Sequence, residues 1–317
     1  MLRTLVISCI VGLGGFYIGA NGIPFVRIET PWAIGIYEGS TPFDLQFPSD
    51  HSNPVLTAAD ITDVAAKFVA DPFMLRKERL WYMFFEILNA DTNQGDIGYA
   101  QSLNGFAWSY GKVILDEPFH LSYPQVLEWQ GEYYMVPESH NARSVRLYRA
   151  EAFPENWTFV ANLLEDVDYV DPTVFQYDRK WWLFAAKAAP NENLLYLYHA
   201  DTIVGPWTGH PKNPVVQGSV HTARPGGRVL QWDDRLFRFA QDLRYPGGPA
   251  VRALEVAELT ITNYMEKEVG EEPFLGPSAS GWNAHGMHHI DAHEVSRDAW
   301  IAAVDGMSKR LVYGLGY

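Results

Sequence analysis

The sequence predicts an all-β fold, a five-bladed β-propeller made of four-stranded antiparallel blades. Three observations support this. A polar opener, a short apolar strand, a polar turn and an aromatic-rich strand recur about every 50 residues, and five copies fit into 317 residues. Repeats of this length that each read as several short strands are typical of propellers. No long helical period occurs in 30–317; the best helix candidate, 57–69, is short.

The two clearest copies are "FVADPFMLRKERLWYMFFEI" at 68–87 and "YVDPTVFQYDRKWWLFAAK" at 169–187. In both, the first Trp follows the opening Asp by ten positions. Weaker copies occupy 122–139, 227–242 and 289–306. The five openers are Asp71, Tyr123, Asp171, Arg228 and Asp291.

Each unit continues into a third strand, and the first three units also show a fourth, more polar strand introduced by a Trp. In the last unit, "KRLVYGLG" at 309–316 is the expected third strand. No sequence remains for a fourth, so "PWAIGIYEG" at 31–39 is expected to supply it and to close the ring.

The first strand of each propeller blade lines the central channel, so the openers should form a ring at one mouth of it. A Pro at the first position of such a strand costs no ladder hydrogen bond. The second strands end at Glu86, Glu138, Ala186, Asp242 and Asp305. We expect Glu86, Glu138 and Asp242 to lie beside or behind the ring.

Composition excludes several classes of partner. The chain has 38 acidic and 24 basic side chains, a net charge of −14, which disfavours nucleic acid and anionic membrane surfaces. Its single cysteine, Cys9, allows no internal disulfide and no Cys-based zinc site. There is no phosphate loop or dinucleotide fingerprint, so no nucleotide cofactor is expected. The oligomeric state stays open.

Residues 1–22, "MLRTLVISCIVGLGGFYIGANG", carry Arg3 ahead of a mostly apolar stretch that ends at small residues. This pattern predicts a signal peptide or an N-terminal anchor, hence an exported or membrane-anchored protein. The alternative is a buried first strand in a cytosolic protein. Residues 23–317 are expected to form a single propeller domain.

The arrangement resembles the five-bladed propellers of glycoside hydrolase families 43, 32 and 62, which share "ADP" in the first blade, "VDP" two blades on and "GPW" at 205–207. Over roughly 31–306 the chain is more similar to the N-terminal domain of glucosamine inositolphosphorylceramide transferases. Phrases in the same order carry that resemblance, among them "IGIYEGSTPFDL", "GDIGYAQS", "HLSYPQV", "LYRAEAFPENW" and "HHIDAHE". The transferase activity of that family is assigned to a separate C-terminal domain, so it is not carried over.

Glycoside hydrolysis needs a proton donor at the leaving oxygen and a second carboxylate that activates water or attacks the sugar. The resemblance to families 43 and 32 implies that Asp71 is the base or nucleophile and that Asp171 orients the substrate. Their general acid is a fourth-blade Glu, and the fourth blade here offers Arg228 and Asp242 instead. We therefore expect Glu138 to donate the proton, because the apolar strand before it would raise its pKa.

Further polar groups are expected to bind substrate. Arg224 and Arg228 flank two glycines, where they would clamp an anionic group or, alternatively, neutralise the acids. Alternatively, Glu86 and Glu138 only accept hydrogen bonds that hold neighbouring blades together. The predicted substrate-binding residues are Glu86, His120, Tyr123, Arg224, Arg228, Asp242, His289 and Asp291.

The stretch "NAHGMHHIDAHE" invites a metal site, and His289, Asp291 and His293 would share one face of a strand. We nevertheless expect no transition-metal site and leave a central Ca²⁺ open. The sequence predicts a carbohydrate-active protein, first a glycoside hydrolase. A non-catalytic glycan- or glycolipid-binding module, a glycosyl-transferring variant and a purely structural ring of acids are the alternatives.

Overall fold

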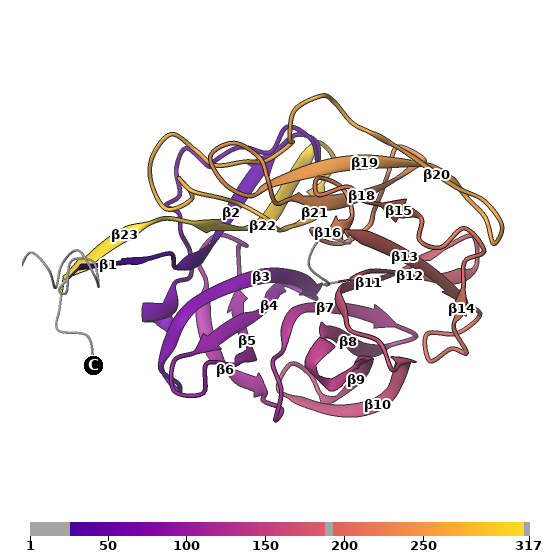
Figure 1. Cartoon of the computed structure of the whole chain (residues 1–317). Coiled ribbons are helices and arrows are strands. Elements are labelled where there is room, and N and C mark those ends of the chain that lie inside the picture. Colours follow the sequence, from indigo (N-terminus) through magenta and orange to yellow (C-terminus); the bar gives the residue numbers. More distant parts are fainter. Residues whose placement is uncertain (1–25, 188–192, 314–317) are drawn as a thin grey trace, which may run out of the picture.

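Five antiparallel sheets form the body of the protein in a computed structural model, which describes residues 26–187 and 193–313 (Figure 1). Each sheet is one blade, and successive blades pack side by side through their inner strands. The predicted all-β, five-bladed propeller is confirmed. The predicted signal or anchor segment, residues 1–22, lies outside the described residues.

The first two blades each contain four consecutive strands joined by short turns. The first blade contains β3 (Ala66–Lys77), β4 (Leu80–Asn89), β5 (Gly95–Ser102) and β6 (Ser109–Leu115). The second blade contains β7 (Ser122–Trp129), β8 (Glu132–Glu138), β9 (Ser144–Ala152) and β10 (Asn156–Glu165).

The third and fourth blades have a broken strand at one edge. In the third, two short segments pair with the same inner neighbour: the blade contains β11 (Tyr169–Tyr177), β12 (Lys180–Lys187), β13 (Leu194–Ala200), β14 (Thr208–Gly209) and β15 (Val216–Gln217). In the fourth, the innermost strand is split: the blade contains β16 (Arg224–Pro225), β17 (Leu230–Trp232), β18 (Arg235–Asp242), β19 (Ala250–Leu259) and β20 (Tyr264–Glu268).

The fifth blade joins the two ends of the chain, as predicted, but with different strands. It contains β21 (Ile290–Ser296), β22 (Ala299–Met307) and β2 (Trp32–Gly39), in the order β21, β22, β2. β2 is therefore the third strand, not the fourth. Isolated bridges from Gln46 and Leu56 contact its outer edge. The strand expected within 309–316 instead forms β23 (Arg310–Tyr313), which pairs with β1 (Val26–Glu29) in a ribbon beside the ring (Figure 1).

The best helix candidate of the sequence, 57–69, forms almost no helix. Only Ala58–Asp60 is helical, as a 3-10 turn (η1) closed by a capping box between Thr57 and Asp60. A second 3-10 turn, η2, spans His140–Ala142. Strand β3 begins at Ala66, because the apolar side chains that suggested a helix face pair with β4 instead. In the described ranges, no helix has the length and apolar character needed to cross a membrane.

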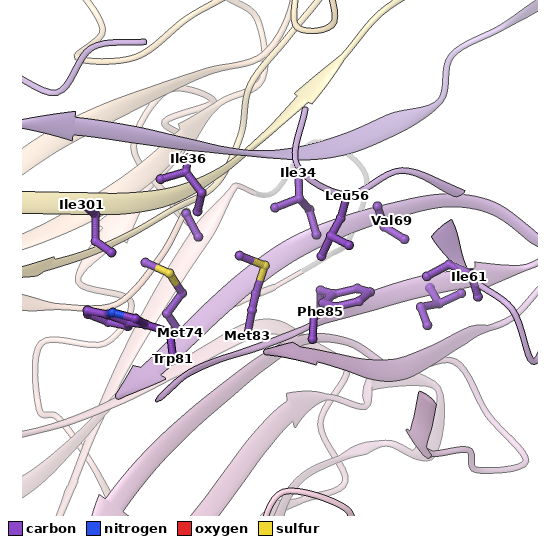
Figure 2. Close-up of a cluster of buried hydrophobic side chains, with 13 residues drawn as sticks. Ile34, Ile36, Leu56, Ile61, Val69, Met74, Trp81, Met83, Phe85 and Ile301 are labelled. Carbon is purple, nitrogen blue, oxygen red and sulfur yellow. The ribbon is translucent and has the colours of Figure 1, made fainter. Parts of the chain in front are cut away.

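Apolar side chains fill the spaces between neighbouring blades. Figure 2 shows the cluster at the closure of the ring, where Ile34, Ile36 and Ile301 of the fifth blade face Met74 and Phe85 of the first. Those five side chains are at most 4% exposed. Burying a side chain of this size contributes roughly 1.5–3 kcal/mol. The closure of the ring is thus held by apolar packing as well as by the β2–β22 ladder.

An irregular backbone is repeated where the first three inner strands approach the channel mouth. Asp71, Tyr123 and Asp171 each precede a Pro and adopt φ values of 54, 47 and 50°. The strand register shifts at each of them. The Pro therefore sits at a bulge inside the strand, not at the predicted first position. Bulges of this kind redirect a side chain and are common beside active sites.

The fourth and fifth blades approach each other most closely at Gly227, which adopts φ of 145°. A Cβ there would lie 1.8 Å from the carbonyl oxygen of Ile290. We expect Gly227→Ala to lower the free energy of unfolding by at least about 1–3 kcal/mol in chemical denaturation. Gly131→Ala, at φ of 81° with nothing within 4 Å, is the control and should lose only about 1 kcal/mol. Equal losses would contradict the close approach.

Candidate active site

Carboxyl groups from four blades meet where the inner strands bulge. We call them the mouth cluster: Asp71, Glu86, Glu138, Asp171 and Asp305. Each is at most 6% exposed. The backbone N–H of Asp71 donates to Asp305 Oδ2 at 3.2 Å, and that of Asp171 donates to Glu138 Oε2 at 3.1 Å. Each bulged Asp is thereby anchored to the second-strand acid of the preceding blade.

Four blades pair the acid at the end of their second strand with a histidine from a loop. The separations are 3.5 Å for Glu86–His120, 2.7 Å for Glu138–His140, 2.6 Å for Asp242–His221 and 2.6 Å for Asp305–His288. The sequence predicted Glu86, Glu138, Asp242 and His120 as site residues, but not their pairing. A histidine partner favours the ionised acid when it lowers the pKa of that acid, as it does for Glu138, Asp242 and Asp305 but not for Glu86.

The third blade has Ala186 at the equivalent position, and Arg224 occupies this side of the mouth. Arg224 Nε donates to Asp171 Oδ2, and Gln241 Nε2 donates to the same oxygen at 2.8 Å. A cavity of about 110 Å³ lies between Ala186 and Arg224. Arg224, which was predicted together with Arg228, therefore supplies the arginine at the mouth, and the predicted opener Arg228 does not.

Burial and neighbouring charges raise the pKa values of three of these carboxyls, those of Asp71, Glu86 and Asp171. Burial raises the pKa of Asp71 to about 6, against the lowering effect of His288. Burial also raises the pKa of Glu86 well above its ordinary value, and the charges of Asp71, Glu138, Asp171 and Asp305 raise it further. The surroundings of Glu86 thus favour a protonated carboxyl.

Glu138 and Asp305 have the opposite character. Burial alone would raise the pKa of Glu138, but the hydrogen bond from His140 and the charge of Arg224 hold it below its ordinary value. Asp305 is likewise held low by His288 despite its burial. The surroundings of Glu138 therefore favour a carboxylate, whereas the sequence suggested a proton donor at this position.

The pKa of Asp171 is raised, like those of Asp71 and Glu86. Burial raises its pKa to about 7, while the charge and hydrogen bond of Arg224 oppose the rise. Because Arg224 and Gln241 both hold Oδ2, the position of this carboxyl is fixed from the fourth blade. That placement fits a residue that orients substrate and other carboxyls, the role implied for it by the sequence resemblance.

Two residues expected in the ring form a separate cluster farther along the inner strands. Arg228 Nε donates to Asp291 Oδ1 at 2.8 Å, while Asp291 Oδ2 accepts from the N–H of Met74 at 2.6 Å and lies 2.9 Å from His293 Nε2. The placement of Arg228 and Asp291 in the opener ring is therefore wrong. Their contact with substrate stays a prediction.

Tyr123 and His289 fill the centre between the inner strands. The Tyr123 hydroxyl lies 2.9 Å from Thr173 Oγ1 and accepts from the N–H of Gly227 at 2.8 Å. His289 is 0% exposed and packs edge-on against Phe73 and Tyr123. Burial lowers the pKa of His289 to about 4, so its ring is neutral. Substrate contact by either residue stays a prediction that their burial does not favour.

Asp242 belongs to the fourth blade and is 0% exposed. Its carboxylate accepts from Arg252 Nε at 2.8 Å and from the N–H of Arg244 at 3.2 Å, in addition to its pairing with His221. These partners hold its pKa below the ordinary value even though burial opposes them. The acid at the end of the second strand of the fourth blade is thus a fully engaged carboxylate.

Asp71, His288 and Asp305 could hold a cation, since their ligand atoms lie within 4.8 Å of one another. Asp305 is already heavily used, however. Its Oδ1 accepts from the N–H groups of His288 and His289, both at 3.0 Å, and its Oδ2 accepts from Asp71 and lies beside His288 Nδ1. This arrangement accounts for Asp305 as a positioning carboxylate without a metal. A central Ca²⁺ stays the open alternative stated in the sequence analysis.

Sequence reasoning missed several residues that shape the mouth: His140, Gln241, His288 and Asp305. Asp305 was recognised as a strand end, and its place in the repeat was the signal that could have added it to the site. Strand alternation would place His288 on the face opposite to His289, but His288 precedes β21 and lies in a loop. No sequence signal marks His140 or Gln241.

Comparison with known proteins agrees with this architecture. Residues 27–307 match the model of the family described as glucosamine inositolphosphorylceramide transferase 1, N-terminal. The glucosamine inositolphosphorylceramide transferase 1 of Oryza sativa subsp. japonica is 36% identical over 303 residues, a match that covers 88% of this chain and 40% of that protein. The chain therefore spans about two fifths of the length of this relative.

Solved structures with the same fold are more distant in sequence. A putative glycoside hydrolase from Parabacteroides distasonis superposes with a TM-score of 0.60 at 13% identity, covering 82% of this chain and 95% of that one. A family 117 glycoside hydrolase from Zobellia galactanivorans gives 0.54 at 14% identity, covering 90% and 91%. At such identities the likeness establishes the propeller fold alone.

Proposed function

This chain belongs to the family of glucosamine inositolphosphorylceramide transferase N-terminal domains, and from that premise we propose that it is a carbohydrate-active propeller that hydrolyses a glycosidic bond at the mouth cluster. The supporting observation is the convergence of buried carboxyls with opposite protonation tendencies. Glycosidases use one protonated and one ionised carboxyl on either side of the scissile bond. Pairs of acids whose surroundings separate their pKa values mark such roles.

In this proposal Asp71 is the base. Its carboxylate accepts a proton from water, the water oxygen bonds to the anomeric carbon, and the bond to the leaving oxygen breaks. A protonated carboxyl of the cluster gives its proton to that oxygen, so the charges balance. Asp171 and Arg224 orient the sugar relative to the acids. An anomer of inverted configuration is expected; retention would make Asp71 the nucleophile instead.

The proposal is tested by incubating the protein with a panel of neutral and acidic oligosaccharides and analysing the products. Release of a shorter sugar, absent from an Asp71→Asn, Glu138→Gln double variant prepared in parallel, would support it. Formation of a longer glycan would identify the glycosyl-transferring variant, in which a sugar hydroxyl replaces water. No turnover of any glycan would count against catalysis at this site.

The pH dependence should carry the signature of Asp71. Because the base acts only when ionised, kcat/KM should rise as the pH increases through about 6, the pKa to which burial raises Asp71. The groups whose charges act on it are His288, Asp305, Arg224 and Glu138. A pH–rate profile checks this. A rising limb near pH 4, the ordinary range of a carboxyl, would contradict the assignment.

A non-catalytic glycan- or glycolipid-binding module is the second candidate, favoured by the full engagement of Asp242. Arg252, Arg244 and His221 occupy Asp242, and Arg224 of the same blade faces the mouth beside the cavity at Ala186. This candidate expects calorimetry to detect binding of a glycan that is never cleaved, with affinity lost in Arg224→Gln. Export or membrane anchoring through residues 1–22 also remains part of the proposal, as does the extent of the domain, 23–317.

A further inference from the structure

Two neighbouring blades carry the same Glu–His pair with different geometry. In the second blade, His140 Nδ1 lies 2.7 Å from Glu138 Oε1, and that hydrogen bond with Glu138 raises the pKa of His140. In the first blade, His120 Nε2 lies 3.5 Å from Glu86 Oε1. Glu138 and His140 therefore form a close ion pair, whereas Glu86 and His120 make only a loose contact between a carboxyl and an imidazole.

The tautomer of His120 follows from its other contact. Its Nδ1 accepts a hydrogen bond from the N–H of Gly95 at 2.9 Å. A neutral imidazole with an acceptor at Nδ1 carries its hydrogen on Nε2, which faces Glu86 Oε1. Burial lowers the pKa of His120, which keeps the ring neutral. His120 can therefore orient Glu86 without adding the positive charge that would ionise it.

Close packing holds this arrangement in place. A Cβ on Gly95 would lie 2.8 Å from His120 Cε1 and 3.0 Å from Glu86 Oε1. Glu86 is 6% exposed, and four other carboxyls of the mouth cluster surround it. Because its Oε1 faces the N–H of His120, a proton on Glu86 belongs on Oε2. This contact favours Oε2 as the oxygen of Glu86 that carries the proton.

We propose that Glu86, not Glu138, is the proton donor of the mouth cluster, and that His120 is the positioning residue that fixes which oxygen carries the proton. This rests on the proposed glycoside hydrolysis. Glu86 Oε2–H gives its proton to the glycosidic oxygen as the bond to the anomeric carbon breaks, and the electron pair of that bond stays on the departing oxygen. Water delivers its proton to Asp71 and its oxygen to the sugar.

The first test uses leaving groups of different acidity. Glu86→Gln should lower kcat by about 10²–10⁴-fold on a glycoside with a sugar leaving group, because proton donation contributes that much. On a dinitrophenyl glycoside, which needs no proton, the loss should be less than about tenfold. Glu155→Gln, a change on an exposed acid beside Lys112, should alter neither rate. Equal losses on both substrates, or no loss on either, would overturn the assignment.

The role of His120 is tested by its pH profile. In His120→Gln the amide can still donate to Glu86, so kcat should fall less than about tenfold. The descending limb of the pH–rate profile, which reports loss of the proton from Glu86, should be kept. In His120→Ala the orientation is lost, and the descending limb should shift while KM stays close to wild type. An unchanged limb in His120→Ala would show that His120 only packs.

A readout without turnover separates this inference from the hydrolase proposal. Infrared difference spectra of wild type against Glu86→Gln at pH 7 should show the band of a protonated carboxyl, whereas Glu138→Gln should remove a carboxylate band. If the protonated band is absent, Glu86 is not the donor, whatever the protein hydrolyses. If it is present and no glycan is cleaved, the proton is in place and the hydrolase proposal is what fails.

Discussion

Asp71→Asn is expected to reduce kcat/KM on a cleaved glycan by about 10²–10⁴-fold, since a positioned base contributes on that order. The change removes the proton acceptor and little else. Asn tolerates the left-handed backbone conformation that Asp71 adopts at φ of 54° better than most residues. The N–H bond of residue 71 to Asp305 is a backbone bond and is kept.

The control for this prediction is Asp201→Asn. Asp201 lies on the surface of the third blade, 2.7 Å from Lys180, with its side chain 85% exposed. The Asp201→Asn substitution makes the same chemical change far from the mouth, so both activity and fold should stay at wild-type levels. An Asp71→Asn protein with wild-type turnover and an intact circular dichroism spectrum would exclude Asp71 as the base.

The largest loss of stability is expected from Asp291→Ala, about 3–5 kcal/mol in the free energy of unfolding. The substitution leaves Arg228, whose side chain is 21% exposed, without its carboxylate, and it removes the acceptor of the Met74 N–H. Burial would raise the pKa of Asp291, but Arg228 and His293 hold it well below the ordinary range. Its stabilising effect is therefore present above the ordinary carboxyl pKa, about 3.9, and is lost only at lower pH.

Urea denaturation of a double-mutant cycle measures this contribution. Asp291→Ala combined with Arg228→Ala should cost less than the sum of the two single changes, because the unpaired charge is gone. Asp201→Ala, which breaks an exposed pair, should cost no more than about 1 kcal/mol. Strict additivity of the Asp291 and Arg228 changes would show that the two side chains do not stabilise each other.

The repeat in the sequence was sufficient to predict the propeller and the place of Asp71 and Asp171 at the mouth. Both depend on local signals, an Asp-Pro step followed by a two-strand apolar pattern, which the fold preserves in every clear copy. The fifth blade departs from this rule. The register of β21 runs without a shift from Ile290 to Glu294, so no bulge turns Asp291 toward the mouth.

The protonation state of each acid depends on tertiary contacts, which the spacing of residues in the sequence does not reveal. Glu86 and Glu138 occupy equivalent strand ends, yet one faces a neutral His120 and the other a close His140 from the η2 turn. Which loop folds back onto which acid is decided by turn geometry. The sequence could therefore predict that acids gather at the mouth, but not which of them holds a proton.

The most direct test of the account is a crystal structure of the Asp71→Asn variant with an uncleaved oligosaccharide. The account predicts a glycosidic oxygen within about 2.6–3.2 Å of Glu86 Oε2, with residue 71 and a water on the opposite side of the anomeric carbon. A sugar bound away from the mouth cluster, or one whose glycosidic oxygen contacts neither Glu86 nor any other carboxyl there, would contradict it.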